Sequence, residues 1–134
     1  MIFKSNDEMT IAEYRRLTHP LLMELTSLLS FLSQVIRIAP KILIGMEDTN
    51  LKAEKLSWRT DTLDVREPFK VTHTLLMRCA SSFAECTNAY MNYDFEEAVR
   101  IKGEGLYYMD LWTAAMKLAE EGTPLHQKDG RLRL

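Results

Sequence analysis

The most regular hydrophobic pattern in the chain runs from Pro20 to Ile38. Its main apolar residues follow one another at alternating steps of four and three, which makes one continuous seam on a helix. A second apolar row repeats every seven residues beside the first. Because only a narrow polar stripe is left, the pattern predicts the central helix of a bundle or a helix at a subunit interface. The two rows are Leu21, Leu25, Leu28, Leu32 and Val35, and then Leu22, Leu29 and Ile36.

The chain before this seam predicts a short helix of its own. Thr10 followed by Glu13 fits a capping box, in which each side chain satisfies a free backbone amide at a helix start. The helix would run from Ile11 to about Thr18. Proline lacks an amide hydrogen and restricts the residue before it, so Pro20 predicts a break or kink and the start of a new helix.

Beyond the seam the pattern weakens. Residues 41–59 predict a shorter and less regular helix, with a bend or short loop near Asp48, since glycine and turn-forming residues interrupt its first half. Residues 60–67 are mostly polar and predict the longest loop of the protein. Pro68 is well placed to open the next helix, because proline is tolerated in a first turn.

Two long amphipathic helices follow, at 68–91 and 95–121, with apolar residues spaced by three, four and seven. The intervening turn is short, which predicts an antiparallel hairpin. Asp94 and Glu97 repeat the capping pattern. Gly122 marks the helix end, since glycine is favoured just beyond a C-terminus. Gly103 and Gly105, inside the last helix, indicate either a close approach of a neighbouring helix or a hinge.

The hairpin also carries a local resemblance. Residues 83–99, FAECTNAYMNYDFEEAV, are similar to the turn region of a tetratricopeptide repeat, in which an Asn-Ala-Tyr stretch leads through a turn to Asp-aromatic-Glu-Glu-Ala. The turn is one residue shorter here and no second copy follows, whereas such arrays need about three repeats. We therefore interpret the segment as two antiparallel helices that pack against each other in a similar way, and not as a repeat of that family.

These elements together predict an all-α fold. We expect a bundle of four to five helices within a single domain at 1–122, whose last two helices form an antiparallel hairpin. Residues 123–134 predict a flexible C-terminal tail. At 134 residues with 46% hydrophobic and 27% charged residues, the chain is long enough to bury one core.

The composition argues against a general affinity for nucleic acid and against a membrane span. Its 17 basic residues are outnumbered by 19 acidic ones, so the net charge of −2 provides no general attraction for nucleic acid. Leu25 to Ile36 is the longest uncharged run, and it is too short to span a bilayer. Cys79 and Cys86 would lie roughly 10 Å apart on one helix, too far for a mutual disulfide. We expect a cytoplasmic protein without a membrane span.

No pattern in the sequence indicates catalysis or a cofactor. The Glu-x-x-His pairs of dimetal bundles are missing, and His73, Cys79 and Cys86 lie at different heights on one helix rather than around one ion. The Glu-x-x-Glu and Glu-x-x-Asp pairs that could hold Mg²⁺ on a helix, a nucleophile elbow and a phosphate-binding glycine loop are also missing. We therefore expect no metal, no cofactor and no enzyme, although a helical enzyme of unfamiliar type stays an open alternative.

Basic residues collect around the predicted loop together with an aromatic side chain, a combination suited to phosphate contact and base stacking. The alternative interpretation is a surface of ion pairs with the loop's own carboxylates, which we favour. The residues concerned are Trp58, Arg59, Arg66, Lys70 and Arg78.

Surplus apolar surface supports a different function. Tyr107 and Tyr108 point about 100° apart on a helix, so at least one should be exposed, and exposed aromatic residues are enriched in protein interfaces. Leu22, Leu29 and Ile36 form the second apolar row, which the weak helix after Pro40 covers poorly. We expect a small interaction protein, an adaptor, chaperone, inhibitor or regulator, that works through helix packing as a homo-oligomer; the alternative is a nucleic-acid or nucleotide-binding helical protein.

Overall fold

The computed structural model describes residues 8–38, 46–122, 126–128 and 131–133, and the side chains within 8–34 and 46–122. Its described residues contain four helices, α1 (Ile11–Ile38), α2 (Met46–Asp61), α3 (Lys70–Met91) and α4 (Phe95–Glu120). The predicted all-α helical bundle is confirmed.

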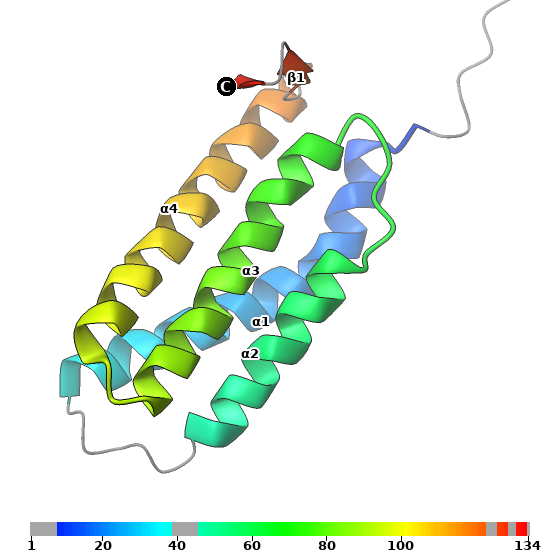
Figure 1. The fold of residues 1–134 in the computed structure, drawn as a ribbon. Helices are drawn as coiled ribbons and strands as arrows, with labels where there is room; N and C mark the ends of the chain where they lie inside the picture. Colours follow the sequence, from blue (N-terminus) through cyan, green and yellow to red (C-terminus); the bar gives the residue numbers. More distant parts are fainter. Residues whose placement is uncertain (1–7, 39–45, 123–125, 129–130, 134) are drawn as a thin grey trace, which may run out of the picture.

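The helices form two layers. Figure 1 shows α2, α3 and α4 side by side, each antiparallel to the next, with α1 passing behind them at an angle. Leu21, Leu25 and Leu32 of the α1 seam are buried, so this face of α1 packs against the layer made by the other three helices. This arrangement leaves the opposite side of α1 toward solvent.

The predicted break at Pro20 is wrong, because α1 is a single helix of 28 residues with Pro20 inside it. Proline removes the hydrogen bond that its own amide would donate to the carbonyl of Arg16, and its ring crowds that carbonyl, so the helix continues with a local bend. Figure 1 shows α1 changing direction behind the other helices. The alternative of a kink therefore fits the structure.

The helix predicted at 41–59 has different limits. From Met46 onward α2 is continuous through Asp48 and ends at Asp61, so the bend predicted within this part is wrong. Residues 41–45 lie outside the described residues. The connecting loop lies two residues later than expected, and α3 begins at Lys70 rather than at Pro68.

The capping box of Thr10 with Glu13 is confirmed by two hydrogen bonds. For Asp94 with Glu97 only the Asp94 half is present, because the amide of Asp94 donates to the carbonyl of Ala89 and the Glu97 carboxylate accepts from Arg100. The amide of Glu13 donates to Oγ1 of Thr10 at 3.1 Å, and the amide of Thr10 donates back to Glu13 Oε1 at 3.3 Å. At the start of α4, the amide of Glu97 donates to Oδ1 of Asp94 at 3.3 Å. Gly122 follows the end of α4 with φ of 87°, a conformation that glycine adopts without strain.

The core lies between the two layers. Leu21, Leu25 and Leu32 of the predicted seam are buried, whereas Leu28 is half-buried. Gly105 shows why α3 and α4 approach closely, since a Cβ at this position would lie only 2.5 Å from Cε1 of Phe83. Of the two glycines, close helix approach is therefore confirmed for Gly105 only, since a Cβ at Gly103 would meet no described atom within 4 Å.

The tail contains backbone structure that the sequence pattern did not predict. Strands β1 (His126–Lys128) and β2 (Arg131–Arg133) pair in an antiparallel register. Figure 1 places this hairpin beside the end of α4.

Candidate functional site

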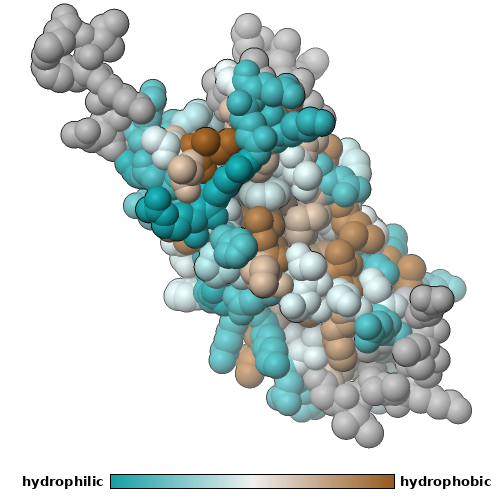
Figure 2. All heavy atoms as spheres, turned by 180° about the vertical axis from the view of Figure 1, so that it is seen from behind, coloured by the Kyte–Doolittle hydropathy of each residue, from teal (hydrophilic) through white to brown (hydrophobic). Residues whose placement is uncertain are grey.

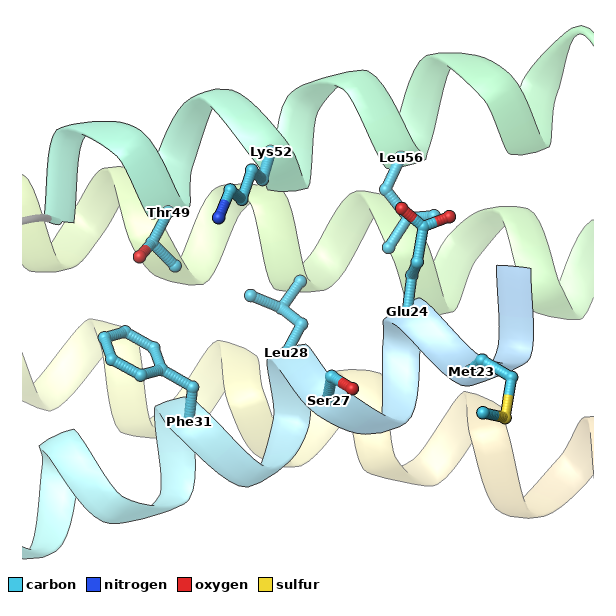
Figure 3. Close-up of a pocket in the computed structure, with 8 residues that line it drawn as sticks. All are labelled: Met23, Glu24, Ser27, Leu28, Phe31, Thr49, Lys52 and Leu56. Atoms are coloured by element: carbon cyan, nitrogen blue, oxygen red, sulfur yellow. The ribbon is translucent and has the colours of Figure 1, made fainter. Parts of the chain in front are cut away.

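A groove of about 620 Å³ lies between α1 and α2. Its lining residues occur at helical spacings of three and four on both helices, so each helix presents one continuous stripe to the groove. Figure 3 shows Glu24, Leu28 and Phe31 projecting from α1 toward α2, whereas the end of the Met23 side chain turns away from α2 at the edge of the groove. The lining residues are Met23, Glu24, Ser27, Leu28 and Phe31 from α1, with Thr49, Lys52 and Leu56 from α2.

The groove combines a buried base with exposed apolar walls. Leu56 is only 4% exposed and Leu28 is half-buried, so both belong to the packed interior. Met23 is 61% exposed and Phe31 is 37% exposed. The apolar surface of the groove is thus continuous from buried core residues at its base to exposed side chains at its rim. Seen from the side on which α1 lies, hydrophobic residues form patches within a more polar surface (Figure 2).

Polar groups occur at separate places along this groove. Nη1 of Arg59 donates to Oε2 of Glu24 at 2.5 Å, which ties α2 to α1. The Lys52 ammonium lies on the other side of Leu28, and its side chain extends toward the space between the helices (Figure 3). A mostly apolar groove with a few placed charges is typical of a recognition surface.

The second apolar row of α1 lies beside this groove. Leu22 and Leu29 are half-buried and pack against the core, and Leu22 also lines a separate groove of about 490 Å³ between α1 and α4. The side chain of Ile36 lies outside the described residues. The structure therefore places Met23 and Phe31, rather than Leu22 and Leu29, at the more exposed positions of α1.

Tyr107 and Tyr108 differ as the helix geometry required. Tyr107 is 59% exposed, whereas Tyr108 is half-buried and its hydroxyl accepts a hydrogen bond from Nη1 of Arg78 at 3.3 Å. The guanidinium of Arg78 also lies 5.6 Å from the centre of the Tyr108 ring, within the range of a cation–π contact. This aromatic pair lies on α4, whereas the groove lies between α1 and α2.

The basic residues around the α2–α3 loop do not share one site. Arg59 pairs with Glu24, and Arg66 pairs with Glu13 at 3.0 Å, so both bind carboxylates of α1. Arg78 is occupied with Tyr108 on α4. Both loop-flanking arginines are thus ion-paired, but the partners shown lie on α1, whereas the sequence interpretation named the loop's own carboxylates. Trp58 and Lys70 are exposed.

A buried chain of hydrogen bonds joins all four helices at the other end of α1, and sequence reasoning did not find it. Nε2 of His73 lies 2.8 Å from the carbonyl oxygen of Thr60, which can only accept, so this nitrogen carries the hydrogen. Nδ1 is then the acceptor, and the Tyr14 hydroxyl donates to it at 2.9 Å. Nε1 of Trp112 donates to the Tyr14 oxygen at 3.0 Å.

This arrangement favours neutral forms of both titratable groups. Burial lowers the pKa of His73, although its hydrogen bond to Thr60 and the charge of Asp61 act in the opposite direction. Burial also raises the pKa of the Tyr14 hydroxyl far above its ordinary value. Because every polar atom in the chain of hydrogen bonds already has a partner, we interpret it as a structural element of the core.

The two cysteines belong to α3 and are buried in the core of the bundle. Burial raises the pKa of Cys79 to about 12 and that of Cys86 to about 11, so both thiols stay protonated at neutral pH. Across the described residues, no cluster of three or more His, Cys, Asp or Glu side chains has the arrangement of a metal site. Within the same part of the chain, no helix is long and apolar enough to cross a membrane.

Comparison of the chain with protein-family models, with curated proteins and with solved structures returned no match. The geometry of the groove and the chemistry of its lining residues are therefore the features of this chain that bear on its function.

Proposed function

We propose that this chain is a small protein-interaction module, of the adaptor, chaperone, inhibitor or regulator kind, that acts through helix packing as a homo-oligomer. The proposal includes the cytoplasmic location expected from the sequence. The docking surface is the groove between α1 and α2.

The supporting observation is the exposure of Met23 and Phe31 above an apolar base. Both side chains line the groove that Leu28 and Leu56 connect to the core. A helix from a partner that lay along α1 and α2 would remove these apolar atoms from water, which is the main driving force of association. Methionine is also common at binding surfaces because its side chain adapts to different shapes.

Sedimentation velocity of the purified chain at micromolar concentration tests this proposal. We expect the wild type to sediment as an oligomer and the double variant Met23→Gln/Phe31→Gln to shift toward monomer. Glutamine keeps a good helix propensity and adds no charge beside Lys52, so helix content should be unchanged.

Val99→Gln is the matched control, since Val99 is an exposed apolar residue of α4 and does not line the groove. It should leave the sedimentation coefficient unchanged. Tyr107→Gln tests the aromatic surface of α4 that the sequence also indicated. A wild type that is strictly monomeric would contradict homo-oligomerisation, and an oligomer that only Tyr107→Gln disperses would move the interface to α4.

A further inference from the structure

The groove of about 490 Å³ between α1 and α4 has an apolar floor. Thr18, Trp112 and Met116 line it and are buried in the core, and Leu22 is half-buried beside them. The Thr18 hydroxyl donates to the carbonyl of Tyr14 at 2.8 Å, and Nε1 of Trp112 donates to the Tyr14 hydroxyl. The hydrogen-bonding groups of the floor therefore have partners within the chain, and the surface that they leave to the groove is mainly apolar.

Polar and charged side chains surround this floor. Arg15 forms an ion pair with Glu120, so the charges of these two groups offset each other. Within 8–34 and 46–122, no ion pair involves Lys117. The rim of the groove therefore has a net positive charge, which Lys117 carries. The exposed lining residues are Arg15, His19, Thr113, Lys117 and Glu120.

The order of residues along the two helices places this charge relative to the floor. Figure 1 shows α1 and α4 running in opposite directions, and the ion pair of Arg15 with Glu120 marks one end of the groove. Leu22 lies about two turns further along α1, and Trp112 lies about two turns back along α4. Lys117 lies about one turn back from Glu120. A ligand whose charge contacts Lys117 can therefore extend its apolar part toward Leu22 and Trp112.

We propose that this groove binds a small amphipathic anion, a molecule with one carboxylate group and an apolar body. Its carboxylate binds Lys117, and its apolar body covers Trp112, Met116 and Leu22. The volume of the groove lies within the range of about 300–1,000 Å³ found for small-molecule sites, which typically combine an apolar lining with a few polar groups. A hydrogen bond between an ammonium and a carboxylate is stronger than one between neutral groups, so the charge at the rim favours an anion. This site is separate from the groove between α1 and α2 and does not rest on the proposed self-association.

Fluorescence of Trp112 tests this proposal, with octanoate as the probe. The protein has two tryptophans, and Trp58 is exposed on α2, so the variant Trp58→Phe leaves Trp112 as the only one. We expect a saturable change in fluorescence as octanoate is added, because Trp112 forms part of the floor. Acetate lacks the apolar chain and octylammonium carries the opposite charge, so each should bind about tenfold more weakly than octanoate, or worse.

Charge reversals locate the bound carboxylate. Lys117→Glu should raise the dissociation constant of octanoate about tenfold or more, because repulsion replaces a charge-assisted contact. Lys55→Glu is the matched control, since it makes the same change of net charge at an exposed position of α2 outside the lining of both grooves. Lys52→Glu tests the groove between α1 and α2, which also has an apolar lining and a lysine. Both of these variants should leave the dissociation constant unchanged.

Titration calorimetry measures the same dissociation constants without relying on fluorescence, and circular dichroism checks that each variant keeps the helix content of the wild type. Absence of octanoate binding by both methods would overturn the proposal. Binding that Lys52→Glu weakens and Lys117→Glu does not would place the ligand between α1 and α2, and equal weakening by all three reversals would indicate a general effect of net charge. Either result, or octylammonium binding as tightly as octanoate, would also overturn it. The proposed function is tested separately, by the oligomeric state of the protein without octanoate.

Discussion

The two ends of α1 differ in how their side chains are buried. Near its start, the hydroxyl of Tyr14 joins Trp112 of α4 to His73 of α3 in the core, and His73 continues the chain of hydrogen bonds to Thr60 of α2. Two turns and more further on, Met23 and Phe31 line the groove between α1 and α2 and are partly exposed. At one end, α1 is therefore fixed to the rest of the chain by buried hydrogen bonds. At the other, it presents apolar side chains that are partly exposed to solvent.

This difference indicates where the chain specifies its own fold and where it is suited to a partner. A hydrogen-bond chain with every member satisfied accepts few alternative packings, since any shift leaves a buried group without a partner. An apolar groove has no such requirement and gains free energy from any surface that covers it with good fit. Substitutions at the two ends should therefore differ in kind as well as in size.

The largest effect on folding is expected from Leu32→Ala. Leu32 is 0% exposed, so removing its side chain should cost about 2–5 kcal/mol of unfolding free energy through lost burial and the cavity left behind. Urea unfolding monitored by circular dichroism measures this change. A loss below about 1 kcal/mol would mean that α1 packs far less tightly against the layer of α2, α3 and α4 than the structure indicates.

Tyr14→Phe should have the next largest effect. The ring, stacked on Phe69 with centroids 4.7 Å apart, is kept, but Nε1 of Trp112 and Nδ1 of His73 both lose their partner. Leaving buried polar groups unpaired should lower the unfolding free energy by about 1–3 kcal/mol. The same substitution at the exposed Tyr107 should change it by less than about 0.5 kcal/mol; equal effects at both positions would contradict a structural role for the buried chain.

The pH dependence of stability follows from His73. In the unfolded chain this histidine titrates near its ordinary pKa of 6.5, whereas burial lowers its pKa in the fold. Below pH 6.5 the unfolded state therefore binds a proton that the folded state does not, so stability is complete above this pH and decreases as the pH falls toward the lower folded pKa. The slope approaches about 1.4 kcal/mol per pH unit.

Urea unfolding between about pH 5.5 and 8 tests this slope. The variant His73→Gln should lose most of it, although its stability at neutral pH will also be lower. The exposed His19 is the control, and His19→Gln should keep the slope of the wild type. A wild type whose stability is flat across this range would contradict the neutral, buried histidine.

Sequence patterns predicted the structural features that depend on residues close together in the chain, such as helix caps and the buried face of a helix. The capping bonds of Thr10 with Glu13 span three residues, and the burial of Leu25 and Leu32 follows from their place in a helical seam. Pro20 was misinterpreted because the penalty for one missing hydrogen bond is local, whereas the tertiary packing that keeps α1 continuous is distributed along the whole helix.

The candidate sites depended on contacts between distant residues. Tyr14 and His73 are 59 positions apart, and no spacing rule connects them. The sequence contained a partial indication of the groove, since Met23, Ser27 and Phe31 recur every four residues and so lie on one stripe of α1. Whether that stripe is covered depends on the separation of α1 and α2, which neither helix determines alone. The sequence thus indicated excess apolar surface on α1 but did not indicate which stripe stays open.

The smallest effect on folding is expected from Met23→Gln, and this substitution sharpens the contrast between the two ends of α1 most directly. Met23 is 61% exposed, and glutamine has a similar helix propensity, so the unfolding free energy of the monomer should change by less than about 0.5 kcal/mol. Self-association should nevertheless weaken, because the substituted side chain lines the groove. Measuring both quantities on one sample, by urea unfolding at low concentration and by sedimentation at high concentration, separates folding from assembly. A variant that lost stability without losing association would assign Met23 to the core and remove the apolar wall from the proposed interface.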